Sequence, residues 1–292
     1  MPELPEVETI KNGLSRFVLF KEIKDVFLID FKLFSGTEKE LKKLKKDKIF
    51  KIERLGKAIV FFFEKSKKKM IIHLKMTGQL VYFLQEKNNS SILTAGGHSE
   101  KNQKKLDIKD FKHLRFKMSF VDGSFLALND TRRFAYLKLL SDVDLEKMKN
   151  RLGLEPLSSD FIFESFLNVL KNKKKNIKAF LLDQKYVSGI GNIYADEILF
   201  ASKISPFRSV DSLSDKEKKA IYQNIKRILK LAVEKKGTTF NDYVDASGQS
   251  GGFWPLLKVY GRKGEKCKTC SGLIIKTKLA GRGTHYCPKC QC

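Results

Sequence analysis

The chain has 292 residues, of which 42% are hydrophobic, so it is long enough for two or three domains and too apolar to be disordered. Lys and Arg number 58 against 33 Asp and Glu, and the formal net charge of +25 suits a polyanionic partner, with nucleic acid ahead of an anionic membrane surface. No apolar run approaches the ~18 residues of a transmembrane helix, and the N-terminus lacks the pattern of a signal peptide, so we expect a cytoplasmic, nucleoid-associated protein with no membrane partner.

The chain opens with MPELPEVE, in which Pro2 directly follows the initiator Met. Removal of that Met would leave the secondary amine of Pro2 at the N-terminus, and α-amino groups have a reference pKa near ~8. Such an amine can attack an aldehyde-level carbon to give an iminium ion, and the adjacent Glu3 carboxylate suits acid–base help. The alternative is that Pro2 is a spacer and the acids only open a helix, which apolar residues at helical spacing predict from Val7 to Val18.

Between Ile23 and about Leu140 the pattern is mostly that of strands. Ala58 to Phe63 is a continuous apolar run, typical of a strand buried on both faces, and Asp122-Gly123 marks a hairpin turn. We therefore predict an antiparallel β-sandwich with an N-terminal helix over residues 1–150. The polar stretch from Gln85 to Asp110 is expected to be a long surface loop.

After residue 150 the pattern becomes helical. A linker at Leu152–Pro156 precedes four expected helices, over Asp160–Asn172, Ile177–Asp183, Asn192–Ser202 and Ser214–Lys236. Before the third helix, Gly189-x-Gly191-Asn192 would let backbone N–H groups and the Asn192 side chain face a phosphate. We predict a helical domain over residues 151–258, with a Gly/Ser-rich loop at 246–253, and a separate module over residues 259–292.

That last module is predicted to hold one structural zinc ion. Cys267-x2-Cys270 and Cys287-x2-Cys290 are separated by sixteen residues, enough for one hairpin between two knuckles. Because four thiolates fill the coordination shell, we expect His285 to be a surface residue of that hairpin. Arg282, which stands between two glycines, is either a solvated charge or a phosphate ligand.

Taken together, these motifs resemble those of bacterial formamidopyrimidine-DNA glycosylase. The matching stretches are, in chain order, MPELPEVET, HLKMTG, TRRF, LGLEPLS, VSGIGNIYADEIL, VYGRKGEKC and GRGTHYCPKCQ. The resemblance implies an α+β multidomain fold: a β-sandwich, a helix-two-turn-helix domain and a β-hairpin zinc finger. It also implies a monomeric enzyme that removes oxidised purines, mainly 8-oxoguanine and formamidopyrimidines, from duplex DNA and cleaves the abasic strand by β- and δ-elimination.

The resemblance assigns the catalytic residues as well. Pro2 matches the Schiff-base nucleophile and Glu3 its acid–base partner, while Glu6 resembles a supporting acid or only opens the helix. Lys57 matches the lysine that holds a phosphate and takes part in β-elimination, although alone it reads as a surface lysine. Arg282 matches the finger arginine of phosphate binding and δ-elimination.

Six residues match DNA-contacting positions. Met76, Arg132 and Phe134 match the side chains that fill the gap left by an extruded base, although a Met and a Phe on strands are more often core residues. Contacts to the DNA backbone or bases are expected from His113, Arg132, Lys175 and Asn192, although Lys173–Lys175 alone reads as a solvated charge run.

The chain departs from the family pattern at Thr131, Lys75 and Arg115. Two rival functions stay open on the sequence. One is the sister enzyme endonuclease VIII, which shares the amine chemistry and prefers oxidised pyrimidines. The other is a zinc-ribbon DNA-binding protein without catalytic activity. It would explain the charge and the cysteines, but not why Pro2-Glu3, Lys57 and Arg282 occur together.

Overall fold

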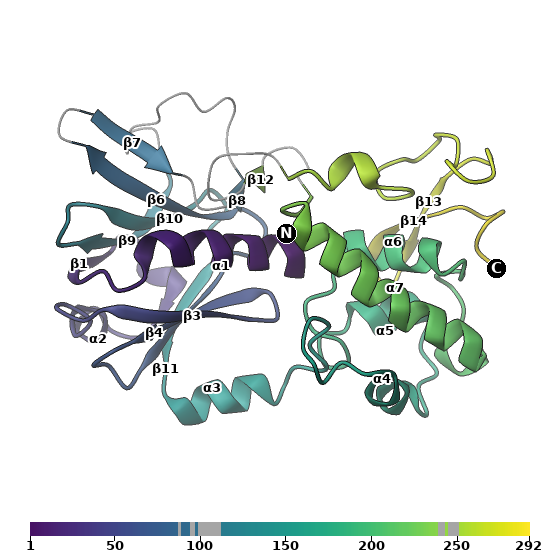
Figure 1. The fold of residues 1–292 in the computed structure, drawn as a ribbon, viewed down its shortest axis with the longest axis horizontal. Helices are drawn as coiled ribbons and strands as arrows, with labels where there is room; N and C mark the ends of the chain where they lie inside the picture. The colour runs from purple at the N-terminus through teal and green to yellow at the C-terminus, as the bar shows by residue number, and fades with distance from the viewer. Residues whose placement is uncertain (87–88, 94–96, 99–111, 239–242, 245–250) are drawn as a thin grey trace. The chain divides into compact units, whose positions relative to one another are not determined.

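The computed structural model describes residues 1–86, 89–93, 97–98, 112–238, 243–244 and 251–292 (Figure 1). Backbone contacts divide the chain into two compact units. The first unit consists of Met1–Asn150 and Lys235–Gly252, and the second of Arg151–Glu234 and Phe253–Cys292. The domain boundaries that we expect after residues 150 and 258 remain a prediction.

The first unit is a sandwich of two five-stranded sheets, in the orders β1-β9-β10-β6-β7 and β2-β11-β5-β4-β3. The strands of the first sheet are β1 (Ile23–Leu28), β6 (Gly78–Glu86), β7 (Asn89–Leu93), β9 (Leu114–Phe120) and β10 (Phe125–Asp130). Those of the second are β2 (Phe34–Ser35), β3 (Ile49–Leu55), β4 (Ala58–Phe63), β5 (Lys69–His73) and β11 (Tyr136–Leu140). Neighbours in these sheets pair antiparallel except β2 and β11, which are parallel, so the predicted sandwich is confirmed with one exception.

Helix α1 (Leu4–Val18) contacts strands of both sheets, and Figure 1 shows it lying between them. Its buried stripe of Val7, Ile10, Leu14 and Val18 belongs to the main hydrophobic core, as the helical spacing predicted. The packing of this stripe fixes the beginning of the chain on the sandwich.

The expected loop at Gln85–Asp110 is only partly a loop. Its first residues extend β6, which pairs with β7, and β8 (Gly97–His98) pairs with β12 (Tyr243–Val244). Because β7 is the edge strand of its sheet, a polar sequence can occupy it, and the sequence pattern therefore did not reveal it. The rest of this stretch lies outside the described residues, as do positions 246–250 of the expected Gly/Ser-rich loop.

Short helices complete the first unit. The α-helices α2 (Glu38–Lys42) and α3 (Asp142–Lys149) and the 3₁₀ helix η1 (Phe31–Leu33) were not predicted, because elements of this length carry too few apolar positions to show a period. The Ser141 hydroxyl accepts the Asp144 N–H at 3.1 Å and so caps α3.

The second unit contains the four predicted helices, each somewhat shorter than expected. They are α4 (Phe163–Leu170), α5 (Ile177–Leu182), α6 (Asn192–Ala201) and α7 (Asp215–Glu234), accompanied by the 3₁₀ helices η3 (Val210–Ser212) and η4 (Trp254–Leu256). A capping box precedes α7: Ser214 N–H donates to Glu217 Oε2 at 2.7 Å, and Glu217 N–H donates to Ser214 Oγ at 3.3 Å. The finger hairpin consists of β13 (Ile275–Leu279) and β14 (Arg282–Tyr286).

The expected linker at Leu152–Pro156 is bonded into the second unit. Gly153 N–H donates to Gln184 O at 2.8 Å, and Leu154 N–H donates to Tyr186 O at 3.0 Å. A Cβ at Gly153 would lie 2.3 Å from the Tyr186 carbonyl, so only glycine fits this approach. The start of the second unit is therefore held against the segment that precedes α6.

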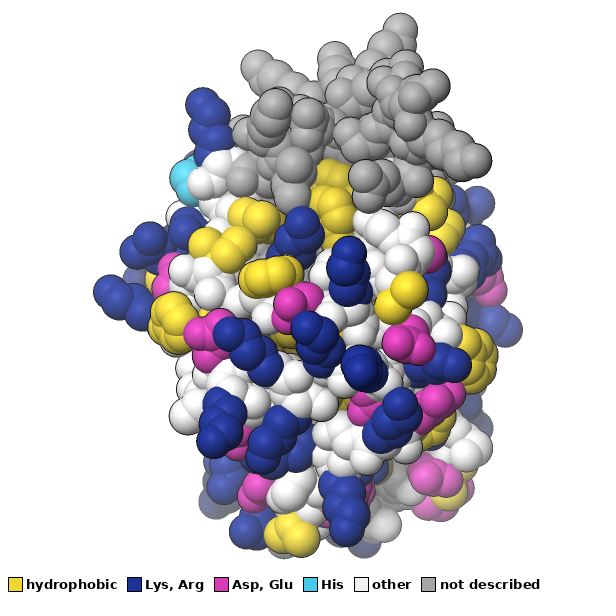
Figure 2. Space-filling view, turned by 90° about the vertical axis from the view of Figure 1, so that its left-hand side faces the viewer, with side chains coloured by type: hydrophobic (Ala, Val, Ile, Leu, Met, Phe, Trp, Pro, Cys, Tyr) yellow, Lys and Arg dark blue, Asp and Glu magenta, His cyan; other side chains and the backbone are white. Residues whose placement is uncertain are grey.

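Among the described helices, none combines the length and the apolar composition needed to cross a membrane. On the face drawn in Figure 2, Lys and Arg side chains are interspersed with acidic and hydrophobic ones. The net charge of +25 therefore does not by itself single out a binding surface on that face.

Candidate active site

The two residues predicted to act on the substrate, Pro2 and Glu3, are both buried at the start of α1. Glu3 is the N-cap residue of α1, and the residue is only 3% exposed. The backbone N–H of Glu3 donates to Glu6 Oε2 at 2.8 Å. Because this bond holds the backbone one residue beyond Pro2, the position of the proline is fixed by the helix start.

Glu6 has a second partner far away in the sequence. Its Oε1 accepts the backbone N–H of Thr238 at 2.8 Å, and the residue is 3% exposed. The neighbouring Gly237 has φ +81°, and a Cβ there would lie 2.9 Å from Glu6 Oε1. The carboxylate thus ties the start of α1 to the segment that leads into the Gly/Ser-rich loop. Within the first unit it bridges two chain segments, a role that neither sequence alternative for Glu6 included.

Lys57 lies in the two-residue turn that joins β3 to β4, after Gly56 with φ 56°. Arg54 holds this turn against α1, since its Nε donates to Glu8 Oε2 at 2.8 Å and its Nη1 donates to Gly56 O at 2.9 Å. Burial acts to raise the pKa of Glu8, but hydrogen bonds from Lys11 and the positive charge and hydrogen bond of Arg54 lower it, so this carboxylate is ionised at neutral pH.

His73 is a neighbour of Lys57 that the sequence reasoning missed. It pairs across the sheet with Ala58, and its Nδ1 accepts the backbone N–H of Lys75 at 3.0 Å. Burial and the positive charges of Lys75 and Lys57 lower the pKa of His73 to about 3. The ring is therefore neutral at pH 7, and because Nδ1 is an acceptor, its proton is on Nε2. Only the register of β4 and β5 reveals this proximity.

The three predicted gap-filling residues lie in the two loops that leave β5 and β10. Met76 is 43% exposed and Phe134 is 50% exposed, so neither is a core residue. The Arg132 guanidinium lies 4.7 Å from the centre of the Phe134 ring, as a cation–π pair. The two large apolar side chains thus stand exposed, whereas a structural role would bury them.

Asp130 joins these two loops. It is fully buried and accepts hydrogen bonds from the Thr77 hydroxyl, from Arg132 N–H at 3.2 Å and from Ala135 N–H at 2.8 Å. Thr77 follows Met76 directly, so one carboxylate positions the backbone beside all three exposed residues. The sequence signal for Asp130 was absent, since an acid at the end of a strand reads as a surface residue.

The departure at Arg115 has a structural reason. Arg115 Nε donates to Asp130 O at 3.0 Å, and its Nη1 lies 3.8 Å from Asp30 Oδ2, which also pairs with Arg133 Nε at 3.1 Å. His113, the predicted DNA contact, is half-buried just before β9, and its carbonyl accepts Asp130 N–H at 2.9 Å. Arg115 therefore supports the loop that carries Arg132.

In the second unit, Asn192 is the first residue of α6, as predicted. Its Nδ2 donates to Gly283 O at 2.9 Å, in the finger hairpin. Arg282 is exposed and is the first residue of β14, after the two-residue turn Ala280-Gly281, in which both residues have positive φ. Within this unit, Asn192 is therefore bonded to the residue that directly follows Arg282 in the chain.

Lys175 is engaged by other residues of the same unit. Its Nζ forms an ion pair with Asp183 Oδ2 at 3.0 Å and lies 4.8 Å from the centre of the Tyr186 ring. The hydrogen bond with Asp183 raises the pKa of Lys175, so its charge is present at neutral pH and partly neutralised by that carboxylate.

The four predicted cysteine ligands converge, with their Sγ atoms all within 4.8 Å of one another. Cys270 and Cys287 Sγ are 3.4 Å apart, and Cys267 and Cys290 Sγ are 3.9 Å apart. Four Zn–S bonds of about 2.3 Å in a tetrahedron place sulfur atoms about 3.8 Å apart, so the cluster fits one structural zinc ion.

The expectation that His285 is a surface residue was wrong. It is 6% exposed, its ring packs edge-on at 5.0 Å from the centre of the Tyr260 ring, and its backbone N–H donates to Asp196 Oδ2 at 2.8 Å. Spacing within the finger could not reveal this burial, because the face that covers His285 comes from α6 and the segment before the finger.

A further buried acid, Glu197 of α6, was also missed. Its carboxylate accepts the backbone N–H groups of three consecutive residues, Lys258, Val259 and Tyr260, at 2.9 to 3.1 Å. Burial raises the pKa of Glu197, and these three donors act against it. The acid thus anchors the chain where it enters the finger.

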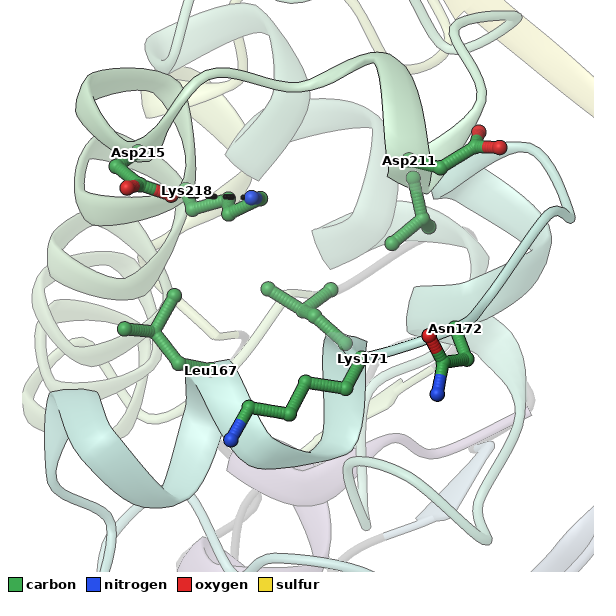
Figure 3. A pocket seen from close by; sticks show the side chains of 8 residues that line it. Leu167, Lys171, Asn172, Asp211, Asp215 and Lys218 are labelled. Carbon is green, nitrogen blue, oxygen red and sulfur yellow. Dashed lines mark hydrogen bonds and ion pairs between the residues drawn. The ribbon is translucent and has the colours of Figure 1, made fainter.

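The second unit also has a pocket of about 240 Å³, shown in Figure 3. It is lined by Leu167, Leu170, Lys171, Asn172, Val210, Asp211, Asp215 and Lys218. None of the predicted site residues lines it, and its Lys218 is already paired with Asp215 at 3.0 Å. The pocket is therefore separate from the candidate site.

Three family models match the chain. They are the formamidopyrimidine-DNA glycosylase N-terminal domain over residues 1–137, the formamidopyrimidine-DNA glycosylase H2TH domain over 152–243, and a zinc finger found in FPG and IleRS over 264–291. Together with the converging cysteines they define a zinc-finger enzyme of the DNA glycosylase/AP lyase class.

Relatives agree over the full length. A formamidopyrimidine-DNA glycosylase of Ligilactobacillus salivarius is 40% identical over 100% of this chain and 99% of its own. Two structures of the Lactococcus lactis Fpg each have a TM-score of 0.82 and cover 99% of both chains, one with abasic-site DNA at 31% identity and one with oxidised-pyrimidine DNA at 32%. The chain belongs to the formamidopyrimidine-DNA glycosylase family.

Proposed function

We propose that this enzyme removes oxidised purines, 8-oxoguanine and formamidopyrimidines, from double-stranded DNA and then cleaves the abasic strand by β- and δ-elimination. It acts as a monomer at chromosomal DNA, and therefore in the cytoplasm at the nucleoid. The observation that carries the proposal is the start of α1, where Pro2 and Glu3 are buried side by side in the chain and the backbone is fixed by Glu6.

In this mechanism the Pro2 nitrogen attacks C1′ of the damaged nucleotide. The C1′–N bond to the base breaks and the base leaves with the amine proton. Glu3, as general acid, then protonates the ribose oxygen as the C1′–O bond opens, and an iminium ion remains. A buried carboxylate next to a nucleophilic amine suits both proton transfers. The zinc ion takes no part in these steps and holds the finger.

The iminium ion acidifies the C2′ proton. Its removal expels the 3′ phosphate from C3′, and loss of the C4′ proton then expels the 5′ phosphate from C5′, which leaves a one-nucleotide gap. We assign the phosphate contacts beside the lesion to Lys57 and to the Nε2–H of neutral His73. The phosphate contacts that assist δ-elimination are assigned to Arg282 and Asn192.

Base extrusion is assigned to the two loops joined by Asp130. Met76 and Phe134 would fill the gap, and Arg132 would pair with the base left opposite it. Their exposure supports this assignment. His113 and Lys175 are assigned contacts to the DNA backbone, and Lys175 would have to leave Asp183 to make one.

Oxidised pyrimidines are the second candidate substrate class. The observation in favour is that a similar enzyme, the Lactococcus lactis Fpg, has been crystallised with DNA that contains an oxidised pyrimidine. A panel of duplexes with 8-oxoguanine, formamidopyrimidine and an oxidised pyrimidine, compared by single-turnover rate, separates the two candidates. Faster excision of the pyrimidine would replace our proposal.

The nucleophile is tested by borohydride trapping on a duplex with 8-oxoguanine opposite cytosine. We expect a covalent adduct that maps to Pro2 by mass spectrometry, and no adduct from Pro2→Gly. Pro5→Ala is the matched control, since Pro5 lies inside α1 and the helix tolerates alanine there. An adduct formed equally by Pro2→Gly would reject the assignment.

A further inference from the structure

Lys178, which no motif singled out, is the only lysine among the fully buried side chains of the described residues. It lies on α5 and is 0% exposed. Its Nζ donates to Gly283 O at 3.0 Å and to Thr284 Oγ1 at 2.8 Å, and forms an ion pair with Asp196 Oδ1 at 2.7 Å. A buried ammonium is costly unless it is paired and hydrogen-bonded, so this arrangement holds three partners in place.

The partner carboxylate also holds the finger. Asp196 lies on α6 with its side chain 0% exposed, and its Oδ2 accepts the backbone N–H of His285 at 2.8 Å. The pair therefore binds three consecutive residues of β14, from Gly283 to His285. Asn192 Nδ2 adds a second donor to Gly283 O. These bonds begin at the residue after Arg282.

One chain of hydrogen bonds reaches Arg282 itself. The Thr284 hydroxyl, which accepts from Lys178 Nζ, donates to the Arg282 carbonyl at 3.3 Å. Thr284 is fully buried, so no water competes for these bonds. Cys287 of the zinc cluster directly follows β14 and holds that end of the strand, whereas the Lys178 bonds hold the end that carries Arg282.

We propose that the buried Lys178–Asp196 pair, acting through Thr284, is a positioning device that sets where Arg282 stands during the δ-elimination step. This inference rests on the proposed role of Arg282. A buried ion pair is weak evidence for a stabilising role, because an apolar pair of similar volume is often as stable. A displacement of about 1 Å in a catalytic group can slow a step by up to about a hundredfold.

The test compares two substitutions at Thr284 in the full-length, zinc-loaded protein. Thr284→Val keeps the shape of the side chain and loses the hydroxyl, whereas Thr284→Ser keeps the hydroxyl. On abasic-site DNA, labelled strands separate the β product, which ends in an unsaturated aldehyde, from the δ product, which ends in phosphate. Zinc content, thermal midpoint and borohydride trapping are measured beside the product ratio.

We expect Thr284→Val to lower the δ-to-β product ratio at least about tenfold while it retains zinc and native trapping. Thr284→Ser should match wild type. A double variant, Lys178→Met with Asp196→Leu, should fold with zinc and show the same low ratio as Thr284→Val, since an apolar pair can replace the stability of the ion pair but not its hydrogen bonds.

The Arg282→Ala variant distinguishes failure of the positioning role from failure of the role assigned to Arg282. If Arg282→Ala lowers the ratio and Thr284→Val and the double variant do not, the positioning role is wrong and the role of Arg282 stands. If Arg282→Ala leaves the ratio native, the assigned role of Arg282 falls and the inference falls with it. A fall in ratio that always accompanies lost zinc and lost trapping would mean that the pair is only structural.

Discussion

Buried carboxylates that accept several backbone N–H groups recur at the scale of single residues. Glu6 binds Glu3 and Thr238, Asp130 binds Arg132 and Ala135, and Glu197 binds three consecutive residues. Each acid accepts N–H groups from segments that lie outside the named helices and strands. Because the two oxygens of one carboxyl group can accept several N–H groups, each acid fixes more than one point of the backbone.

His73 shows the opposite case, a titratable group kept neutral. With a folded pKa of about 3 and an unfolded value of 6.5, the unfolded chain takes up a proton at pH values where the native chain does not. The stability that neutral His73 contributes is therefore present above pH 6.5 and is lost as the pH falls toward 3. The loss between pH 7 and pH 5 amounts to about 2 kcal/mol.

His73→Asn removes this titration and keeps an acceptor for Lys75 N–H. We expect urea unfolding of the wild type to show that loss between pH 7 and pH 5, and the variant to lack it. His113→Asn, which replaces a half-buried histidine of the same unit with the same residue, is the matched control for the substitution itself. An equal pH dependence in His73→Asn and wild type would contradict the low pKa.

At the scale of elements, the loops at the ends of β5 and β10 work as one piece. Thr77 and Arg132 belong to different loops, and both donate to Asp130. Arg115 of β9 and Asp30 brace the same loop from the neighbouring strand. The three exposed residues thus stand on backbone that is fixed from two sides, as their proposed insertion into DNA requires.

Asp130→Asn should loosen both loops, because an amide places a donor where the carboxylate accepts three hydrogen bonds. We expect a loss of about 1–3 kcal/mol in unfolding free energy. We also expect weaker discrimination between bases opposite the lesion, measured as the ratio of excision rates. Glu146→Gln, which breaks only an exposed pair with Lys149, is the control. If Asp130→Asn is destabilised but still discriminates between the bases opposite the lesion as the wild type does, the two loops do not read that base.

At the scale of the whole molecule, the finger is stabilised by other means than the first unit. The first has a large apolar core between two sheets, whereas the finger has only a small buried cluster around Cys267 and Cys287. A segment with so small a core depends on its metal. Removal of zinc is therefore expected to affect the units unequally.

Chelation of zinc should shift the thermal transition of the second unit and leave that of the first in place, as followed by calorimetry with and without added zinc. Cys290→Ser should reproduce the shift. Cys292→Ser should not, because Cys292 is exposed and outside the cluster. A single transition that shifts as a whole on chelation would contradict independent stabilisation of the units.

DNA affinity should fall steeply with salt, with a slope of log K against log salt of about −0.9 per phosphate neutralised. Lys57→Gln and Arg282→Gln should each reduce the slope by about 1. Lys218→Gln, in the pocket of Figure 3 and already paired with Asp215, should leave it unchanged. Equal slopes for all three variants would argue against the assigned phosphate contacts.

The family, the sandwich, the four helices of the second unit and the zinc cluster could all be predicted from the amino-acid sequence. These features rest on local signals: periodicity, turn residues and cysteine spacing act between neighbours in the chain. The candidate residues Pro2, Glu3, Lys57 and Arg282 were found through short motifs for the same reason, and their roles remain proposals.

The ordinary polar residues that hold those candidates in place could be recognised only in the folded chain. Glu6 meets Thr238 across 232 positions, Lys178 meets Thr284 across 106, and His73 approaches Lys57 only through strand register. Burial of His285 was misjudged because the covering residues come from another element. Whether a Lys, His or acid is a solvated charge or an internal anchor depends on which distant segments desolvate it, and folding alone brings those segments together.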